Sequence, residues 1–115
     1  ETILAEKIET VLKRGIYNSR MKDFYDIYVF INNFSNDINY DDLLSAMKNT
    51  FKKRDSLDVL EDYKKILNEL KDNERLNSLW NKYINKRNYA KNIDFFTIIE
   101  LLDGFLDKHS TAVYN

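Results

Sequence analysis

The sequence of 115 residues contains no cysteine and no proline, only two glycines and a single histidine. Without cysteine there is neither a disulfide framework nor a thiolate metal site. One histidine also excludes a metal site built on two histidines. β-Sandwiches and β-barrels need many tight turns, which glycine and proline supply. These absences therefore favour long helices joined by linkers of Asn, Asp and Ser.

Long apolar runs and a strong charge of one sign are also missing. No apolar stretch approaches the roughly 20 residues that a membrane-spanning helix requires, and no charged-then-apolar signal segment opens the sequence. Eighteen basic and nineteen acidic residues give a net charge of −1, so no global field attracts nucleic acid or an anionic membrane. We expect a cytoplasmic protein with no membrane partner, and any RNA contact would be local.

The residues that are present suit one folded domain. Hydrophobic residues make up 43% and charged residues 32% of the sequence, a balance that is typical of globular proteins rather than of disordered ones. The length supports one hydrophobic core. The first residue is not Met and a helical pattern begins at once, so we expect the sequence to be part of a longer protein.

Apolar residues recur at helical spacing in six segments. In the first segment Leu4, Ile8 and Leu12 lie on one face, and Gly15 is a natural stop. Asn39 and Ser56 are expected N-caps of later helices. The expected helices cover residues 1–14, 20–34, 39–54, 56–70, the stretch after Asn73, and the segment from Asp94 to about Lys108. The fold class is therefore all-α, a single compact bundle of about six helices, with a frayed tail beyond Lys108.

Single aromatic and polar residues offer few other sites. Trp80 and Tyr83 could stack a nucleic-acid base, but aromatic residues at helical spacing are more often core. His109, the only histidine, is expected to be exposed in the tail. Ser45 and Ser78 have no base partner in local spacing, so nucleophilic catalysis is not supported.

Charged residues cluster in the first two expected helices. Lys7 and Arg14 are seven residues apart and share a helix face. Asp23 and Asp26, at i and i+3, also share a face, and their repulsion implies a cation nearby. If the two helices are antiparallel, as a short linker favours, Lys7, Arg14 and Arg20 can supply it. Such a mixed patch suits phosphate binding.

The same charges also fit a purely structural interpretation. Acidic residues in the first turn of a helix complement its dipole, and Lys22 with Asp26 forms an ordinary i, i+4 pair. Spacing alone leaves both interpretations open.

Two further basic runs lie in the third and fifth expected helices. They consist of Lys48, Lys52, Lys53 and Arg54, and of Lys82, Lys86, Arg87 and Lys91. On one continuous helix the second run would form a basic stripe against which a tRNA backbone could lie. A solvated helix face is the simpler interpretation.

The opening string ETILAEKIETVLKRGIYNSRMKDFYDIYVF resembles the AEK helix and the R-x-KD-x-x-D motif of the AbiEii/AbiGii family of nucleotidyltransferase toxins, found in abortive-infection and toxin–antitoxin systems. The resemblance covers about the first thirty residues; the remainder agrees in helical character and length. It implies a two-lobed enzyme, in which a nucleotidyltransferase domain with a Gly-Ser motif precedes a helical domain. Residues 1–115 would be that C-terminal helical domain, with the N-terminal catalytic domain absent.

The resemblance also implies roles for individual residues. The catalytic positions would be Lys7, Asp23 and Asp26, and the nucleotide-binding positions would be Lys7, Arg14, Arg20 and Lys22. No metal ligand is expected in these residues, and the Gly-Ser motif and its metal-binding acids are not among them. The domain alone would hold no cofactor and be inactive, whereas the full-length parent would use Mg²⁺ and an NTP.

The same resemblance implies three partners, namely the N-terminal domain of the same chain, an antitoxin protein and a tRNA acceptor. The alternative function is a non-catalytic helical module that binds a protein partner, in which the charged cluster is structural.

Overall fold

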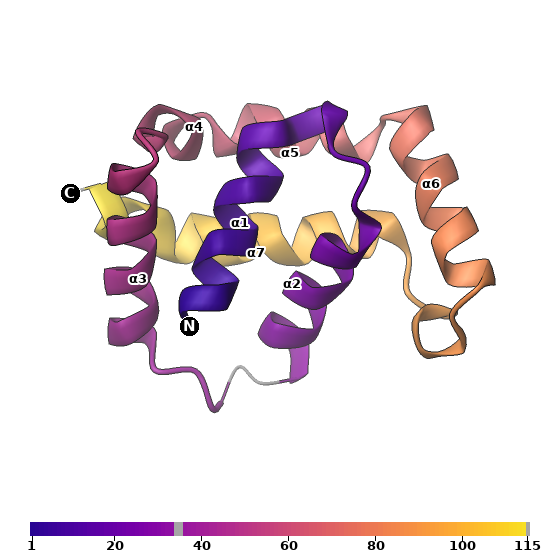
Figure 1. Ribbon diagram of the computed structural model, residues 1–115, viewed down its shortest axis with the longest axis horizontal. Helices are drawn as coiled ribbons and strands as arrows, with labels where there is room; N and C mark the ends of the chain where they lie inside the picture. The colour runs from indigo at the N-terminus through magenta and orange to yellow at the C-terminus, as the bar shows by residue number, and fades with distance from the viewer. Residues whose placement is uncertain (34–35, 115) are drawn as a thin grey trace.

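Helices account for most of residues 1–33 and 36–114, the ranges that the structure, a computed structural model, describes (Figure 1). Within these ranges there are seven α-helices, two short 3₁₀-helices and no strand, which confirms the all-α prediction. In chain order they are α1 (Thr2–Arg14), η1 (Gly15–Tyr17), α2 (Met21–Asn33), α3 (Tyr40–Lys53), α4 (Leu57–Glu61), α5 (Tyr63–Lys71), α6 (Glu74–Asn85), η2 (Asn88–Ala90) and α7 (Phe95–Tyr114).

Local chemistry explains several helix ends. α1 ends at Gly15, whose φ of 53° lies in the left-handed region and whose N–H donates to the Val11 carbonyl. Asn39 caps α3, as predicted, because its side chain accepts a hydrogen bond from the Asp42 N–H at 3.1 Å. α2 is described as far as Asn33; Phe34, included in its predicted range, lies outside the described residues.

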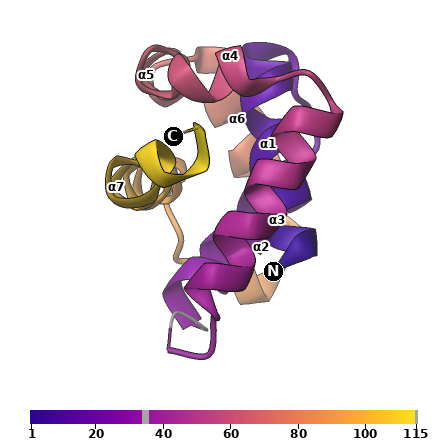
Figure 2. The same ribbon diagram turned by 90° about the vertical axis from the view of Figure 1, so that its left-hand side faces the viewer.

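Three helices, α1, α2 and α3, form a layer that lies across α7. Figure 1 shows α7 running lengthwise while α1, α2 and α3 cross it, and the turned view in Figure 2 places α7 on one side of these three helices. α4 and α5 close one edge, and both contact α7. α1 and α2 run in roughly opposite directions, joined through η1 (Figure 1). This reversal brings the charged faces of the first two helices together.

The core lies between α7 and the helices around it. Its largest fully buried side chains include Trp80, Phe24, Phe51, Leu4, Ile8, Leu12 and Ile27. Trp80 is 1% exposed, and its Nε1–H donates to the Ile93 carbonyl at 2.7 Å. Tyr83 stacks on Trp80 with ring centroids 5.2 Å apart. The prediction that Trp80 and Tyr83 belong to the core is confirmed.

The predicted fourth helix, residues 56–70, is wrong as one element. It is divided at Asp62 into α4 and α5. Both helices contact α1 and α7, but α4 also packs against α3, whereas α5 extends along α7 to η1. Ser56 precedes α4 as predicted but does not cap it with its side chain, since its hydroxyl donates to the Phe51 carbonyl at 3.5 Å.

The prediction of a frayed tail beyond Lys108 is also wrong. α7 continues to Tyr114, and both Ser110 and Val113 are buried. His109 is half-buried and not exposed, because its ring stacks on Tyr40 at 5.0 Å between centroids and also meets Phe105. Burial, and then the charge of Lys108, lower the pKa of His109 below its usual range.

The helices of residues 1–33 and 36–114 differ from membrane-spanning ones. No helix there combines the length and the apolar character that crossing a bilayer requires.

Candidate functional site

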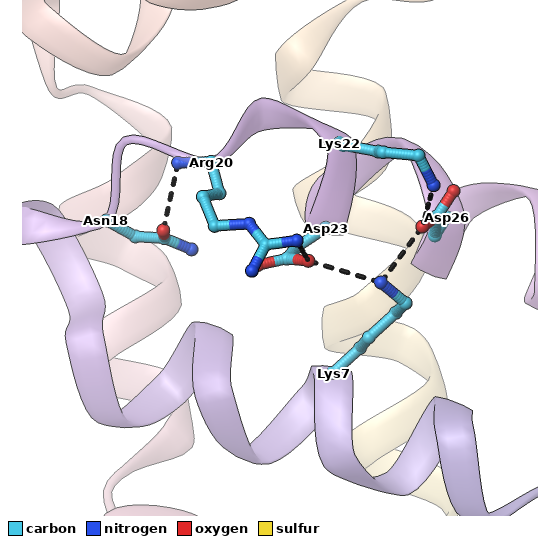
Figure 3. Close-up of polar contacts among 6 residues, drawn as sticks. All are labelled: Lys7, Asn18, Arg20, Lys22, Asp23 and Asp26. Atoms are coloured by element: carbon cyan, nitrogen blue, oxygen red, sulfur yellow. Dashed lines mark hydrogen bonds and ion pairs between the residues drawn. The ribbon is translucent and has the colours of Figure 1, made fainter.

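The predicted charged residues of α1 and α2 do meet across the helix pair. The Lys7 ammonium nitrogen lies 3.2 Å from Asp23 Oδ1 and 2.9 Å from Asp26 Oδ2 (Figure 3). The two aspartates therefore share one cation that comes from the other helix, and this relieves the repulsion that their spacing creates. We call Lys7, Asp23 and Asp26 the lysine–aspartate cluster.

The turn before α2 sets the direction of the aspartates. Asn18 is fully buried, and its Oδ1 accepts a hydrogen bond from the Arg20 N–H at 3.0 Å (Figure 3). The Asp23 N–H donates to the Arg20 carbonyl at 3.1 Å, which opens the first turn of the helix. The buried Nδ2 of Asn18 has no hydrogen-bond partner among the described residues. A side chain that cannot swing into solvent thus fixes where α2 starts.

Arg20 and Lys22 complete the cluster on its outer side. Arg20 Nη2 lies 3.8 Å from Asp23 Oδ1, and Lys22 Nζ lies 2.9 Å from Asp26 Oδ2. The side chains of both cations are more than 60% exposed, whereas that of Asp23 is 5% exposed. The outer cations can therefore reorient toward a ligand, while the inner aspartate cannot.

The contacts within the cluster favour its charged forms. Burial alone would lower the pKa of Lys7, but hydrogen bonds and charge attraction from Asp26 and Asp23 outweigh it, so the pKa is raised. For Asp26, burial alone would raise the pKa, but its contacts with Lys22 and Lys7 outweigh it, so the pKa is lowered. Lys7 and Asp26 are both charged at neutral pH.

A hollow of about 280 Å³ adjoins the cluster, and we call it the α1 hollow. It is lined by Ile3, Glu6, Lys7, Thr10, Arg14, Arg20, Asp23 and Arg54. Four of these side chains are cationic and two are anionic, so the hollow is basic on balance. Its size and charge suit one or a few phosphate groups.

The structure separates the two predicted roles of Arg14. Arg14 lines the α1 hollow with Lys7, as their shared face predicts, but it is not ion-paired to Asp23 or Asp26; among the described residues, Lys7, Arg20 and Lys22 supply those contacts. The prediction that Arg14 acts as a counterion for Asp23 and Asp26 is therefore wrong.

Arg54 is a residue of this site that sequence reasoning missed. It comes from the end of α3 and binds Glu6 at 3.1 Å and the buried Glu9 at 2.7 Å. The i, i+3 spacing of Glu6 and Glu9 was a usable signal, since it implies a cation as strongly as the aspartate pair does. Spacing could not say which distant residue would supply that cation.

Comparison with known protein families decides the assignment. The family model for the nucleotidyl transferase AbiEii toxin, of a type IV toxin–antitoxin system, matches residues 1–106. The chain belongs to the AbiEii toxin family. The match confirms the resemblance carried by the first thirty residues and extends it into α7. No curated protein and no solved structure matched the chain.

The AbiEii-family chain does not present a Mg²⁺ site at this cluster. Mg²⁺ requires oxygen ligands in near-octahedral geometry, whereas both aspartates are engaged by lysines. Over residues 1–33 and 36–114, no group of three or more His, Cys, Asp or Glu side chains could hold a metal. Both carboxylates of the cluster are therefore occupied by ammonium groups.

The second basic run of this AbiEii-family chain is not one helical stripe, contrary to prediction. α6 ends at Asn85, so Lys86 and Arg87 follow the helix and Lys91 lies beyond η2. In the first run, Arg54 is occupied by Glu6 and Glu9. The positions of the basic side chains in these two runs therefore do not follow from the spacing of a single continuous helix.

Proposed function

We propose that this helical domain completes the nucleotide site of a nucleotidyltransferase by placing Lys7 against the phosphates of an NTP. The observation that supports this is the lysine–aspartate cluster at the edge of the α1 hollow, where Lys7 is held between Asp23 and Asp26. Lys7, Asp23 and Asp26 are the proposed catalytic group, and Arg14, Arg20 and Lys22 are proposed to assist binding of the nucleotide.

Electrostatic neutralisation is the contribution that these residues can make. Nucleotidyl transfer builds up negative charge on phosphate oxygens, and fixed cations stabilise that charge without reorganising during the reaction. Two aspartates hold the ammonium group of Lys7 in place, and Arg14 and Arg20 face the same hollow. Asp23 and Asp26 are proposed to act through Lys7, as positioning residues.

The remaining parts of the active site are proposed to lie in an N-terminal domain of the same protein. The α1 hollow, about 280 Å³, is at the lower end of small-molecule sites, which suits phosphates better than a whole nucleotide. The Mg²⁺, the base-binding pocket and the Gly-Ser motif would then come from that domain. We further propose a tRNA acceptor and, from the type IV family description, an antitoxin partner.

The test is nucleotide binding and transfer by the full-length protein carrying Lys7→Ala. We expect transfer to fall by about 10²–10³-fold, comparable with the loss of one charge-stabilising donor, and Lys7→Arg to restore part of it. Asp26→Asn, which keeps Lys7 but removes a positioning charge, should cause a smaller loss.

The matched control is Lys64→Ala. Lys64 is also held by two aspartates, Asp103 at 2.8 Å and Asp107 at 3.0 Å, but between α5 and α7. The Lys64→Ala substitution should leave nucleotide binding and nucleotidyl transfer unchanged. If folded Lys7→Ala protein keeps full activity, the cluster is structural and the domain is better described as a protein-interaction module.

A further inference from the structure

A second hollow, of about 370 Å³, lies where the start of α2 meets the end of α6, and we call it the α2–α6 hollow. Its charged lining consists of Arg20, Lys22, Lys82, Lys86 and Arg87. Of the described residues that line it, none is acidic. Five cations thus gather in one place on a chain whose net charge is −1.

The five cations of the α2–α6 hollow are not all alike, since Arg20 is ion-paired to Asp23 and Lys22 to Asp26. Lys7, Arg54, Lys64 and Lys71 each contact two carboxylates. Lys82 and Lys86, by contrast, are exposed, and neither is ion-paired within residues 1–33 and 36–114. Unpaired lysines beside one another repel, so an anion bound between them would be stabilised.

Aromatic rings continue the hollow on one side. Tyr83 lines it, and its hydroxyl is 3.1 Å from that of Tyr89. The Tyr89 ring also packs 4.9 Å from the Tyr25 ring, yet 58% of Tyr89 is exposed. Arg87 lies over the Tyr83 ring at 4.2 Å. An exposed ring that is braced by neighbours is what a stacked base requires.

We propose that the α2–α6 hollow binds a single-stranded polynucleotide, with backbone phosphates on Lys82, Lys86 and Arg87 and a base stacked on Tyr89. Cations alone would suit any polyanion, and it is the adjoining exposed aromatic ring that specifies a nucleic acid. A single strand is required because a base paired within a duplex does not present its face to a side chain.

The position of the hollow suggests what the strand is for. Arg20 lines both the α1 hollow and the α2–α6 hollow, so a strand bound in the second would end close to phosphates bound in the first. The strand is then the acceptor of the transferred nucleotide, a role that rests on the proposed function, whereas binding of the strand does not.

The experiment measures binding of fluorescein-labelled oligouridylate and its deoxy counterpart to the full-length protein by anisotropy, over a range of salt concentrations. The test variant is Lys82→Glu/Lys86→Glu, and the matched control is Lys48→Glu/Lys52→Glu, a lysine pair at the same i, i+4 spacing on α3. We expect Kd to rise at least about tenfold in the test variant only. The slope of log K against log salt concentration should become about 1.4 smaller in magnitude, because two contacts to single-strand phosphates are lost. Tyr89→Ala should weaken binding about tenfold with an unchanged slope.

Preference between the two oligonucleotides shows which sugar is recognised, and binding of either supports the proposal. Equal weakening in both lysine pairs, no binding by the unsubstituted protein, or equally strong competition by poly-glutamate would each overturn it. NTP binding is measured on the same variants. It should be unchanged in Lys82→Glu/Lys86→Glu and lost in Lys7→Ala, so failure of one proposal is distinguishable from failure of the other.

Discussion

At the scale of single residues, Asp23 shows what a nearly buried charge demands of its neighbours. Its side chain is only 5% exposed and contacts Lys7 at 3.2 Å. A carboxylate removed from water must be compensated by hydrogen bonds and opposite charge, and loss of one partner leaves the other uncompensated. Lys7 therefore contributes to stability as well as to the proposed chemistry.

Lys7→Met keeps much of the stem of the side chain but removes the charge. We expect the free energy of unfolding to fall by about 1.5–3 kcal/mol at neutral pH, as for lost hydrogen bonds to charged groups. The measurement is urea denaturation of both proteins at several pH values.

The pKa shifts of Asp26 and Lys7 predict how this loss of stability depends on pH. The folded pKa of Asp26 is lowered, so its stabilisation is present above the usual value of 3.8 and is lost as pH falls through the folded value. The folded pKa of Lys7 is raised, so its stabilisation is present below 10.5 and is lost as pH rises through the folded value. The difference in the free energy of unfolding between the unsubstituted protein and Lys7→Met should therefore shrink both at low pH and at high pH. A difference that is constant across this range would contradict the assignment to the ion pairs.

Local spacing predicted half of this residue-scale arrangement. The repulsion between Asp23 and Asp26 pointed to a cation, and the short linker offered Lys7, Arg14 and Arg20. Lys7 and Arg20 make these contacts and Arg14 does not. Arg54 could not be found in this way because it reaches Glu6 and Glu9 from forty-five or more positions along the chain. Contacts of that range depend on how the third helix packs, which spacing does not report.

At the scale of helices, Gly104 is a weak point in α7. It lies inside a helix of 20 residues, it is exposed, and a Cβ added there would meet nothing within 4 Å. We expect Gly104→Ala to raise the free energy of unfolding by about 1 kcal/mol, because alanine loses less backbone entropy than glycine.

Gly15→Ala serves as the opposing control. Gly15 has equally open space around it, but its φ of 53° and ψ of −134° form a strained combination that costs other residues about 1–3 kcal/mol. The midpoints of thermal and urea denaturation should therefore rise for Gly104→Ala and fall for Gly15→Ala. A destabilised Gly104→Ala protein would mean that α7 has a conformational need for glycine that its geometry does not show.

Helix type was predictable throughout, and helix boundaries were predictable where a local cap exists. Gly15 and Asn39 end and begin helices through their own backbone and side-chain chemistry. The division at Asp62 and the continuation of α7 past Lys108 have no such local signal. Both follow from packing, since α4 packs against α3 whereas α5 packs mainly on α7 and η1, and Val113 is fully buried.

At the scale of the molecule, one core joins α7 to the layer that crosses it. Trp80 links the peripheral α6 to this core through its hydrogen bond to the Ile93 carbonyl and its packing beside Phe95. Because Trp80 is the only tryptophan, its fluorescence reports on α6, whereas far-UV circular dichroism reports on all helices. We expect the two urea transitions of the 115-residue chain to coincide, as for a two-state domain. An earlier fluorescence transition would show that α6 and η2 open as a separate unit.

The course of α7 bears on where this domain can be cut. The family match stops at residue 106, but the helix does not, and its following turns insert Ser110 and Val113 into the interior. An expression boundary drawn at the match would sever the helix in mid-course and expose the apolar surface that Val113 covers. Recombinant versions of this domain are best designed to retain the chain at least through residue 114.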